Sequence, residues 1–459
     1  MPIKKVFPNE VELKRIQTLR KYEKLHDNEQ ESVLLLHDII KKQFKDIKDI
    51  PYLSHAIPSG VSGFYSDFVQ GDADRLVIDV VNGNEAEQAF IDEVIDNNDL
   101  NEAIGDYAYN QSEYGFEVLL GYVKDNKFYI QTVPKDQYFP QADGSVIFAT
   151  YLFDPTDVKT NLKDRKKILY TQQYKVDGAN VVIERKLWQV DTYGRADEEL
   201  QLAYAGITAL PEEKIENLDR LPIWQIDNGR QTSWGFGKSD YADILPQLAE
   251  VNERRTHIST QLLKNLDAKL QLPSIEAMKD EKGNLKPFDY IMPTKEDVEA
   301  KYIINENPLI ENTEKHIESQ LKMISWTTSV PMFELLKSSM PERVESLRIQ
   351  LFGAVRKTTK KRAQITKGIR NILYIGYLMI NNKEMDGRIA IKYSDVLPTD
   401  ALQETQIESE QITAGLTSKH SAIKRLHNFT DEEADEEIKI INAENIASGA
   451  VNPSEAPTL

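Results

Sequence analysis

The longest helix-like pattern in the 459-residue chain runs from Pro341 to Asn382. Its apolar residues recur at intervals of three and four, which keeps them on one side of an α-helix. They are Val344, Leu347, Leu351, Val355, Ile365, Ile369, Ile372 and Leu373. Roughly forty residues rising about 1.5 Å each would span ~60 Å. A helix this long predicts a crossing between layers or between subunits, since one core needs far less.

The pattern before this helix changes once, near Phe116. Up to that point it is mostly helical, and afterwards apolar and aromatic residues alternate in short runs divided by turn signals such as Asp143-Gly144 and Asp177-Gly178. Helices are predicted at 10–27, 31–47, 58–70, 85–96 and 99–112, and strands at 75–81, 116–123, 127–134, 146–153, 168–176, 181–189, 201–204 and 221–228. We therefore expect a helical N-terminal part followed by an antiparallel β region.

A helix, a small insert and a second helix come next. The first helix is predicted from Ser239, with a kink at Pro246, and the second from Leu309 to Ser329. The insert between them contains two short strand-like runs. This order predicts an out-and-back pair of helices with the insert at its tip. A strand after Asp386 and helices at 401–415, 418–426 and 431–446 complete an α+β, mainly helical fold.

The long helix is basic, whereas the whole chain has a formal net charge of −18. Eight Lys and Arg residues and no acidic residue lie between Ser346 and Arg370. Three interpretations remain open: a solvated helix face, a site for acidic partners in the same oligomer, or direct contact with phosphate. The acidity of the rest argues against a freestanding duplex-binding protein, because its surface would repel phosphates. The chain has no cysteine, so it contains no disulfide and no thiolate metal site.

One passage suggests enzyme chemistry. Gly-Phe-Gly-Lys-Ser, ending at Lys238 and Ser239, follows a predicted strand and precedes a predicted helix, as in a phosphate-binding loop. The full motif needs a glycine where Thr232 stands, so a glycine turn capped by Ser239 fits better. The histidines lack metal-ligand spacing, and no Gly-x-Ser-x-Gly elbow occurs. We expect no enzyme activity, no catalytic residue, no cofactor and no metal.

The order of these pieces resembles the portal proteins of long-tailed phages of Gram-positive bacteria, which form the ring through which the genome enters and leaves the capsid. Four passages carry the resemblance, and their joint order is more specific than any one of them. They are YGFEVLLGYV with VPKDQYFP, GFGKSDYADILPQLAEVNERRTHISTQLLKNLDAKLQLP, SSMPERVESLRIQLFGAVRKT, and YSDVLPTDALQETQIESEQITAGLTSKHSAIKRL with DEEADEEIKIINAE.

The resemblance implies a ring, usually of twelve subunits, each with a wing, stem, clip and crown. By position, the parts are the wing at 1–237, the first stem helix at 238–267, the clip at 268–308, the second stem helix at 309–330, the tunnel loop at 331–341, the long helix and return to the wing at 342–398, the crown at 399–446 and a flexible tail at 447–459. The implied sites are a DNA-facing tunnel loop at Lys337, Ser338, Ser339 and Met340, clip contacts at Asp280, Glu281 and Lys282, and a basic patch at Arg356, Lys357, Lys360, Lys361 and Arg362 that touches phosphate or a neighbouring subunit.

The implied function is a channel at one capsid vertex through which double-stranded DNA is packaged and ejected. Its implied partners are further copies of the chain, the DNA, the terminase, a head-completion or adaptor protein, and the major capsid and scaffolding proteins. No membrane is involved, and the expected locations are the virion and, during assembly, the host cytoplasm. Two alternatives from other classes are an NTPase acting on DNA through Lys238 and Ser239, and a monomeric structural protein of the capsid.

Overall fold

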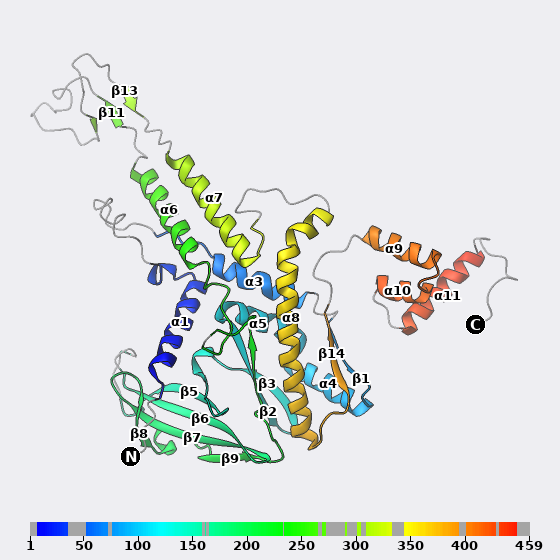
Figure 1. Cartoon of the computed structure of the whole chain (residues 1–459), viewed down its shortest axis with the longest axis horizontal. Coiled ribbons are helices and arrows are strands. Elements are labelled where there is room, and N and C mark those ends of the chain that lie inside the picture. The colour runs from blue at the N-terminus through cyan, green and yellow to red at the C-terminus, as the bar shows by residue number, and fades with distance from the viewer. Residues whose placement is uncertain are drawn as a thin grey trace, which may run out of the picture. The chain divides into compact units, whose positions relative to one another are not determined.

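The structure, a computed structural model, is a mixture of helices and strands in two units (Figure 1). The first unit comprises residues 1–339 and 351–396, and the second comprises residues 340–350 and 397–459. The structure describes residues 7–34, 52–71, 76–157, 161, 165–232, 234–264, 269–271, 290–291, 301–303, 309–332, 344–393, 401–427 and 431–447.

The helices of the first unit begin and end where local signals place them. Asn9 and Asn84 each form a capping box with a glutamate three residues later, and Gly71 and Gly115, both with positive φ, close two of the helices. The α-helices are α1 (Glu10–His26), α3 (Ile57–Gln70), α4 (Glu85–Asn98), α5 (Leu100–Tyr114), α6 (Leu245–Lys264), α7 (Leu309–Thr328) and α8 (Val344–Asn381), and the 3₁₀ helices are η1 (Gln30–Ser32), η3 (Lys135–Gln137) and η5 (Leu202–Ala205).

In the described part of the chain, four sheets accompany these helices. The largest has the order β4-β5-β6-β7-β8, with β9 also paired to β7, and its strands are β4 (Tyr138–Pro140), β5 (Val146–Phe153), β6 (Lys167–Asp177), β7 (Asn180–Val190), β8 (Ala196–Leu200) and β9 (Glu212–Ile215). A second sheet has the order β10-β2-β3, with β2 (Phe116–Lys124), β3 (Lys127–Thr132) and β10 (Ile223–Asp227). The smaller ones pair β1 (Val77–Val81) with β14 (Arg388–Lys392), and β11 (Lys269–Gln271) with β12 (Tyr290–Ile291) and β13 (Lys301–Ile303).

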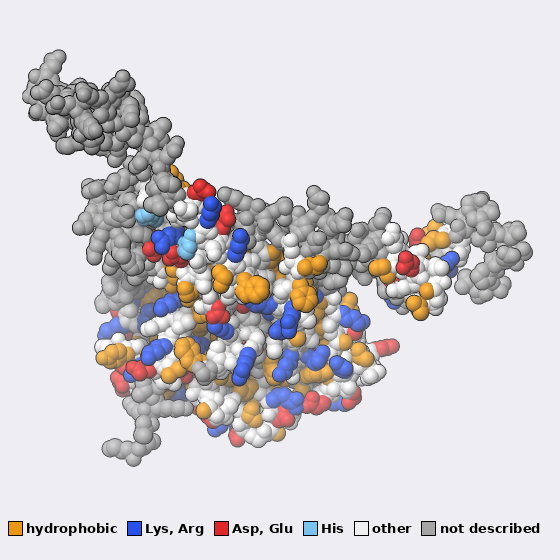
Figure 2. All heavy atoms as spheres, turned by 45° about the horizontal axis from the view of Figure 1, so that its top comes forward, with side chains coloured by type: hydrophobic (Ala, Val, Ile, Leu, Met, Phe, Trp, Pro, Cys, Tyr) orange, Lys and Arg blue, Asp and Glu red, His pale blue; other side chains and the backbone are white. Residues whose placement is uncertain are grey.

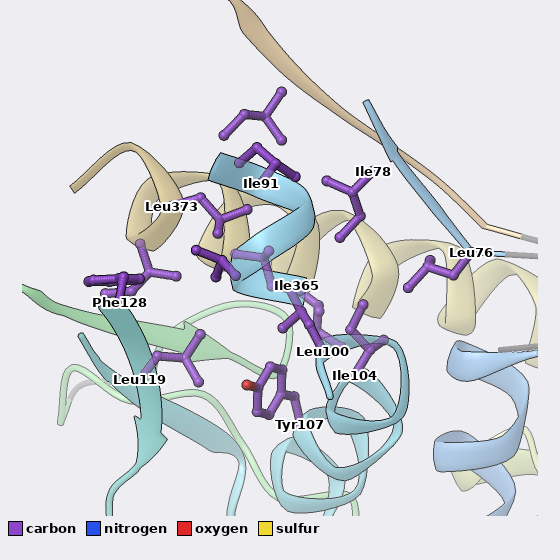
Figure 3. Packing of buried hydrophobic residues seen from close by; sticks show 14 of the residues in the cluster. Leu76, Ile78, Ile91, Leu100, Ile104, Tyr107, Leu119, Phe128, Ile365 and Leu373 are labelled. Atoms are coloured by element: carbon purple, nitrogen blue, oxygen red, sulfur yellow. The ribbon is translucent and has the colours of Figure 1, made fainter. Parts of the chain in front are cut away.

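The long helix α8 supplies much of the main core. Its buried Ile365, Ile369, Ile372 and Leu373 pack with residues of α4, α5, β1, β2 and β3 (Figure 3). Gly376 lets α8 lie directly on the ring of Phe128, because an added Cβ would lie 2.6 Å from that ring. This contact joins the C-terminal half of α8 to the sheet β10-β2-β3.

Among its described residues, the second unit contains the start of α8, up to Gln350, and the complete helices α9 (Ala401–Thr413), α10 (Lys419–His427) and α11 (Asp431–Ala447). The hydroxyl of Ser418 accepts a bond from the amide of Ser421 at 3.1 Å, which caps α10. Ala422 and Ala434 are the small residues buried among the described parts of this unit. The predicted helices at 401–415, 418–426 and 431–446 are therefore confirmed to within two residues at each end.

Most predicted elements agree with the structure, and three points differ. The strand predicted at 201–204 is wrong, since Leu202–Ala205 is the 3₁₀ helix η5, and the strands β4, β8, β9 and β12 were missed. The first helix of the pair begins at Leu245 rather than Ser239, so Pro246 lies in its first turn, where no amide donor is needed and proline gives no reason for a kink. Of the helix predicted at 31–47, only residues up to Leu34 are described, and these form η1 and a turn.

Two glycines within helices should respond in opposite ways to alanine. Gly376→Ala should lower the free energy of unfolding by about 1–3 kcal/mol, because the new methyl group meets the Phe128 ring. Gly63→Ala, in α3, has no atom within 4 Å of the added Cβ and should raise it by up to about 1 kcal/mol. Urea unfolding of both variants checks this, and equal effects would contradict the close packing of α8 on Phe128.

Candidate functional site

The helices α6 and α7 lie side by side, with β11, β12 and β13 between them in the chain (Figure 1). Their seam is apolar and is formed by Leu248 and Val251 of α6 and Ile317, Leu321 and Ile324 of α7. Nε2 of His316 also lies 3.2 Å from Oε1 of Glu250 across the pair. The predicted out-and-back helices with strands between them are thus present in the structure.

A buried carboxylate lies just before the start of this pair. The side chain of Asp240 is 6% exposed and accepts bonds from the hydroxyl of Ser112 at 2.7 Å and the amide of Asn228 at 2.9 Å. Two lysines of α8 approach it, Lys357 at 2.8 Å and Lys361 at 3.1 Å. We call Asp240, Lys357 and Lys361 the ionic anchor, because they join α8 to the residues just before α6.

Burial and charge oppose each other at the anchor. Burial alone would raise the pKa of Asp240, but Lys361, Lys357 and the bond from Ser112 outweigh it and hold that pKa well below its usual range. Burial lowers the pKa of Lys361 to about 8, against the attraction of Asp240. Both groups therefore remain charged near neutral pH.

The ring of Tyr65 connects the anchor to the end of α7. The Nζ atoms of Lys357 and Lys361 lie 4.7 and 5.0 Å from the centre of this ring, and the Tyr65 hydroxyl donates to the carbonyl of Thr328. Lys357 also donates to that carbonyl, at 3.2 Å. Because burial raises the pKa of Tyr65, the hydroxyl keeps the proton that it donates. The anchor thus holds α8 against the ends of α6 and α7 that are nearest to it.

The basic patch predicted on the long helix divides into two groups. Lys357 and Lys361 belong to the anchor, and Arg362 donates to the carbonyls of Val69 and Phe68 at 3.0 and 3.1 Å. These three side chains therefore have partners within the chain itself. Arg356 and Lys360 are exposed, and contact with phosphate or a second subunit stays a prediction for them.

The Gly-Lys-Ser passage does not form a phosphate cradle. The amide of Gly237 donates to Oδ1 of Asp227 at 2.9 Å, and the buried Ser239 hydroxyl accepts from the amide of Tyr241 at 3.1 Å. An added Cβ at Gly237 would lie 2.1 Å from the carbonyl oxygen of Gly115. Lys238 pairs with Asp243 at the surface. The glycine therefore allows a close approach of two backbones, and its own amide already has a carboxylate partner.

The other predicted site residues lie outside the described residues. These are the tunnel-loop residues Lys337, Ser338, Ser339 and Met340 and the clip residues Asp280, Glu281 and Lys282. Among the residues that the structure describes, no three His, Cys, Asp or Glu side chains gather as a metal site would require, and no helix is long and apolar enough to cross a membrane.

Sequence reasoning missed Asp240, and it assigned Lys361 to the basic patch rather than to the interior. A signal for Lys361 was present, because it continues the inward stripe of α8 in steps of three and four. The buried members of this stripe are Leu351, Ala354, Thr358, Lys361, Ile365, Ile369 and Ile372. A lysine inside such a stripe needs a buried acid, but its partner is 121 positions away, and the sequence does not indicate which acid that is.

No protein-family model and no curated protein sequence matches the chain. Among solved structures, a chain from the virion of a native gene transfer agent (GTA) particle and one from the neck of an empty GTA particle each align at 11% identity, over 82% of this chain and 91% of that chain, with a TM-score of 0.43. A chain from the neck of the native GTA particle aligns at 12% identity, over 80% of this chain and 90% of that chain, with a TM-score of 0.40. A likeness this distant carries no argument about function.

Replacing Lys361 should be far more damaging than replacing an exposed lysine. Lys361→Met leaves the buried Asp240 with one cationic partner and should lower the free energy of unfolding by about 3–5 kcal/mol. Lys21→Met, on the exposed side of α1, should change it by no more than about 0.5 kcal/mol. Denaturant unfolding of both variants is the measurement, and a similar small effect for the two would refute the ionic anchor.

The anchor should also be lost in acid. The pKa of Asp240 is lower in the folded chain than in the unfolded chain, where it is about 3.9. Asp240 therefore stabilises the fold fully above about pH 3.9 and progressively less below it. The difference in unfolding free energy between wild type and Asp240→Asn should therefore narrow by roughly 1 kcal/mol from pH 6 to pH 3. Thermal melts across this range test the sign. A difference that widens toward pH 3 would show that Asp240 is not held in its charged form.

Proposed function

We propose that the chain is one subunit of a portal-type ring, a channel at a capsid vertex through which double-stranded DNA is packaged and ejected. The observation that carries the proposal is the paired α6 and α7, with the small sheet β11–β13 between them in the chain and the 38-residue helix α8 after them. These elements follow one another in the order that the sequence resemblance implies for stem, clip and long helix.

In this proposal, α6 and α7 are the stem, 268–308 is the clip, 331–341 is the tunnel loop and the helices α9, α10 and α11 form the crown. The elements before residue 237 are the wing. The clip would contact the terminase during packaging and an adaptor or head-completion protein afterwards. Major capsid and scaffolding proteins would surround the ring, which in the resembled family usually has twelve subunits.

The negative net charge of the chain supports a channel that does not bind the DNA passing through it. Twelve copies of a chain with net charge −18 carry about −216 formal charges. A bore lined by part of this charge would repel DNA phosphates along most of its length, so that DNA slides instead of binding. The cations that could otherwise bind phosphate are partly removed by the fold, because Lys357, Lys361 and Arg362 have partners within the chain.

The ionic anchor gives the proposed channel its mechanical connection. A load applied to the stem would reach α8 through Asp240, Lys357 and the carbonyl of Thr328. Separating these groups would leave charges buried without partners, which costs several kcal/mol. Stem and long helix therefore move together as DNA passes.

The proposal predicts a particle many times heavier than one chain. Size-exclusion chromatography with light scattering should give a mass near twelve times 52.5 kDa, and negative-stain images should show a ring with a central hole. A mass that stays at 52.5 kDa at high protein concentration would end the proposal. Lys238→Ala is the matched control for the NTPase alternative, and it should leave both the mass and the images unchanged, because Lys238 pairs with Asp243 at the surface.

A further inference from the structure

The junction between α7 and α8 exposes large apolar side chains. Trp326 is 84% exposed, Phe352 is 66% exposed and Met323 is 49% exposed. The end of α7 lies against α8 here, because Ser329 lies 3.4 Å from where a Cβ of Gly353 would be and Lys357 reaches the carbonyl of Thr328. The two aromatic side chains alone would bury roughly 300 Å² in a contact. A standard interface buries about 800 Å² on each partner, so these residues would supply a large part of one side.

Exposed cations continue this surface along α8. Arg356 and Lys360 follow Phe352 at intervals of four residues, which places all three on the same side of the helix. We call Met323, Trp326, Phe352, Arg356 and Lys360 the α7–α8 face. On the side of the first unit shown in Figure 2, basic and hydrophobic side chains lie next to one another. Aromatic residues and arginine together are typical of protein interfaces.

A groove elsewhere in the same unit has Asp106 in its lining and no Lys or Arg among the described residues that line it. It has a volume of about 470 Å³ and lies between α5 and the strands β2 and β3, with Ala103, Asp106, Tyr122 and Ile130 among its lining residues. Tyr122 is 39% exposed and stacks on Tyr129 with 5.6 Å between ring centres. We call it the α5 groove. Its lining is mixed, because Tyr107, Tyr122 and Ile130 supply aromatic and apolar surface while Asn98, Asn110 and Thr132 supply polar groups.

The helices that border the groove are strongly acidic. Residues 85–114 contain no Lys or Arg and include nine acidic residues, Glu85, Glu87, Asp92, Glu93, Asp96, Asp99, Glu102, Asp106 and Glu113. Glu102 lies one helical turn before Asp106, and both side chains are exposed. A surface of this charge repels nucleic acid and attracts a cationic protein face.

We propose that the α7–α8 face of one copy docks into the α5 groove of the next copy. The inference rests on the proposed ring, because a contact between two different faces of identical chains closes into a ring when its rotation fits. Trp326 and Phe352 would fill the groove against Tyr122 and Ile130, and Arg356 and Lys360 would meet Glu102 and Asp106. A protein is favoured over DNA as the occupant, since phosphate contact leaves exposed aromatic side chains in water.

A charge swap on the full-length chain tests the contact. Arg356→Glu with Lys360→Glu, and separately Glu102→Lys with Asp106→Lys, should each raise the protein concentration needed for half-assembly at least tenfold. Combining all four substitutions should restore most of the assembly, because the charges are again complementary. Lys167→Glu with Lys175→Glu reverses two exposed lysines of β6 and should leave assembly unchanged. Light scattering across a dilution series gives the masses, and circular dichroism confirms folding.

The outcomes separate this inference from the ring itself. If every variant forms the wild-type ring, the α7–α8 face is not the interface, although the ring stands. Loss of assembly without recovery in the fourfold variant would show that the α5 groove is not its partner. If rings persist while binding of a DNA fragment falls, the α7–α8 face contacts phosphate and the inference is overturned. Trp326→Ala, which changes no charge, should also weaken assembly, and an unchanged mass would contradict the apolar contact.

Discussion

The placement of the long helix depends on one buried carboxylate. Asp240 has lost nearly all contact with water, and its charge is tolerated only because two lysines of α8, a hydroxyl and an amide surround it. A buried ion pair of this kind gives little net stability, but separating its charges costs several kcal/mol. Any arrangement in which α8 is displaced from Asp240 is therefore strongly disfavoured. The ionic anchor therefore fixes where α8 lies against Asp240 and the end of α7, while the apolar contacts at Phe128 and Ile372 supply the larger share of the favourable energy.

Helical periodicity explains how one basic segment has two different roles. Lys357 and Lys361 are four residues apart and point inward to Asp240, whereas Arg356 and Lys360, each one position earlier, point outward. A shift of one residue is about 100° around a helix, so neighbouring cations cannot share a face. The inner pair is part of the core of the subunit, and the outer pair remains available for a partner.

The sequence predicted those parts of the fold whose signals are local. The period of α8, the Asp177-Gly178 turn between β6 and β7 and the glycine after α3 all depend on neighbouring residues, and the structure confirms them. The strand β8 was missed because its charged residues show no alternation, as it lies at a solvent-exposed sheet edge. The anchor was missed for a different reason: its groups come from residues 112, 228, 240, 357 and 361, and only the folded chain brings them together.

The inner and outer cations belong to one continuous helix. A displacement of the outer side of α8 therefore also moves its inner side. A partner that displaces the outer side of α8 must also displace Lys357 and Lys361 from Asp240, and this separates the buried charges of Asp240 and Lys361 at considerable cost. Rotation of the helix about its axis is equally disfavoured, since it would take Lys361 away from Asp240 and turn the buried Ile365 toward water. The remaining way for the chain to respond to a partner is to move as one body from the start of α6 to the C-terminal half of α8.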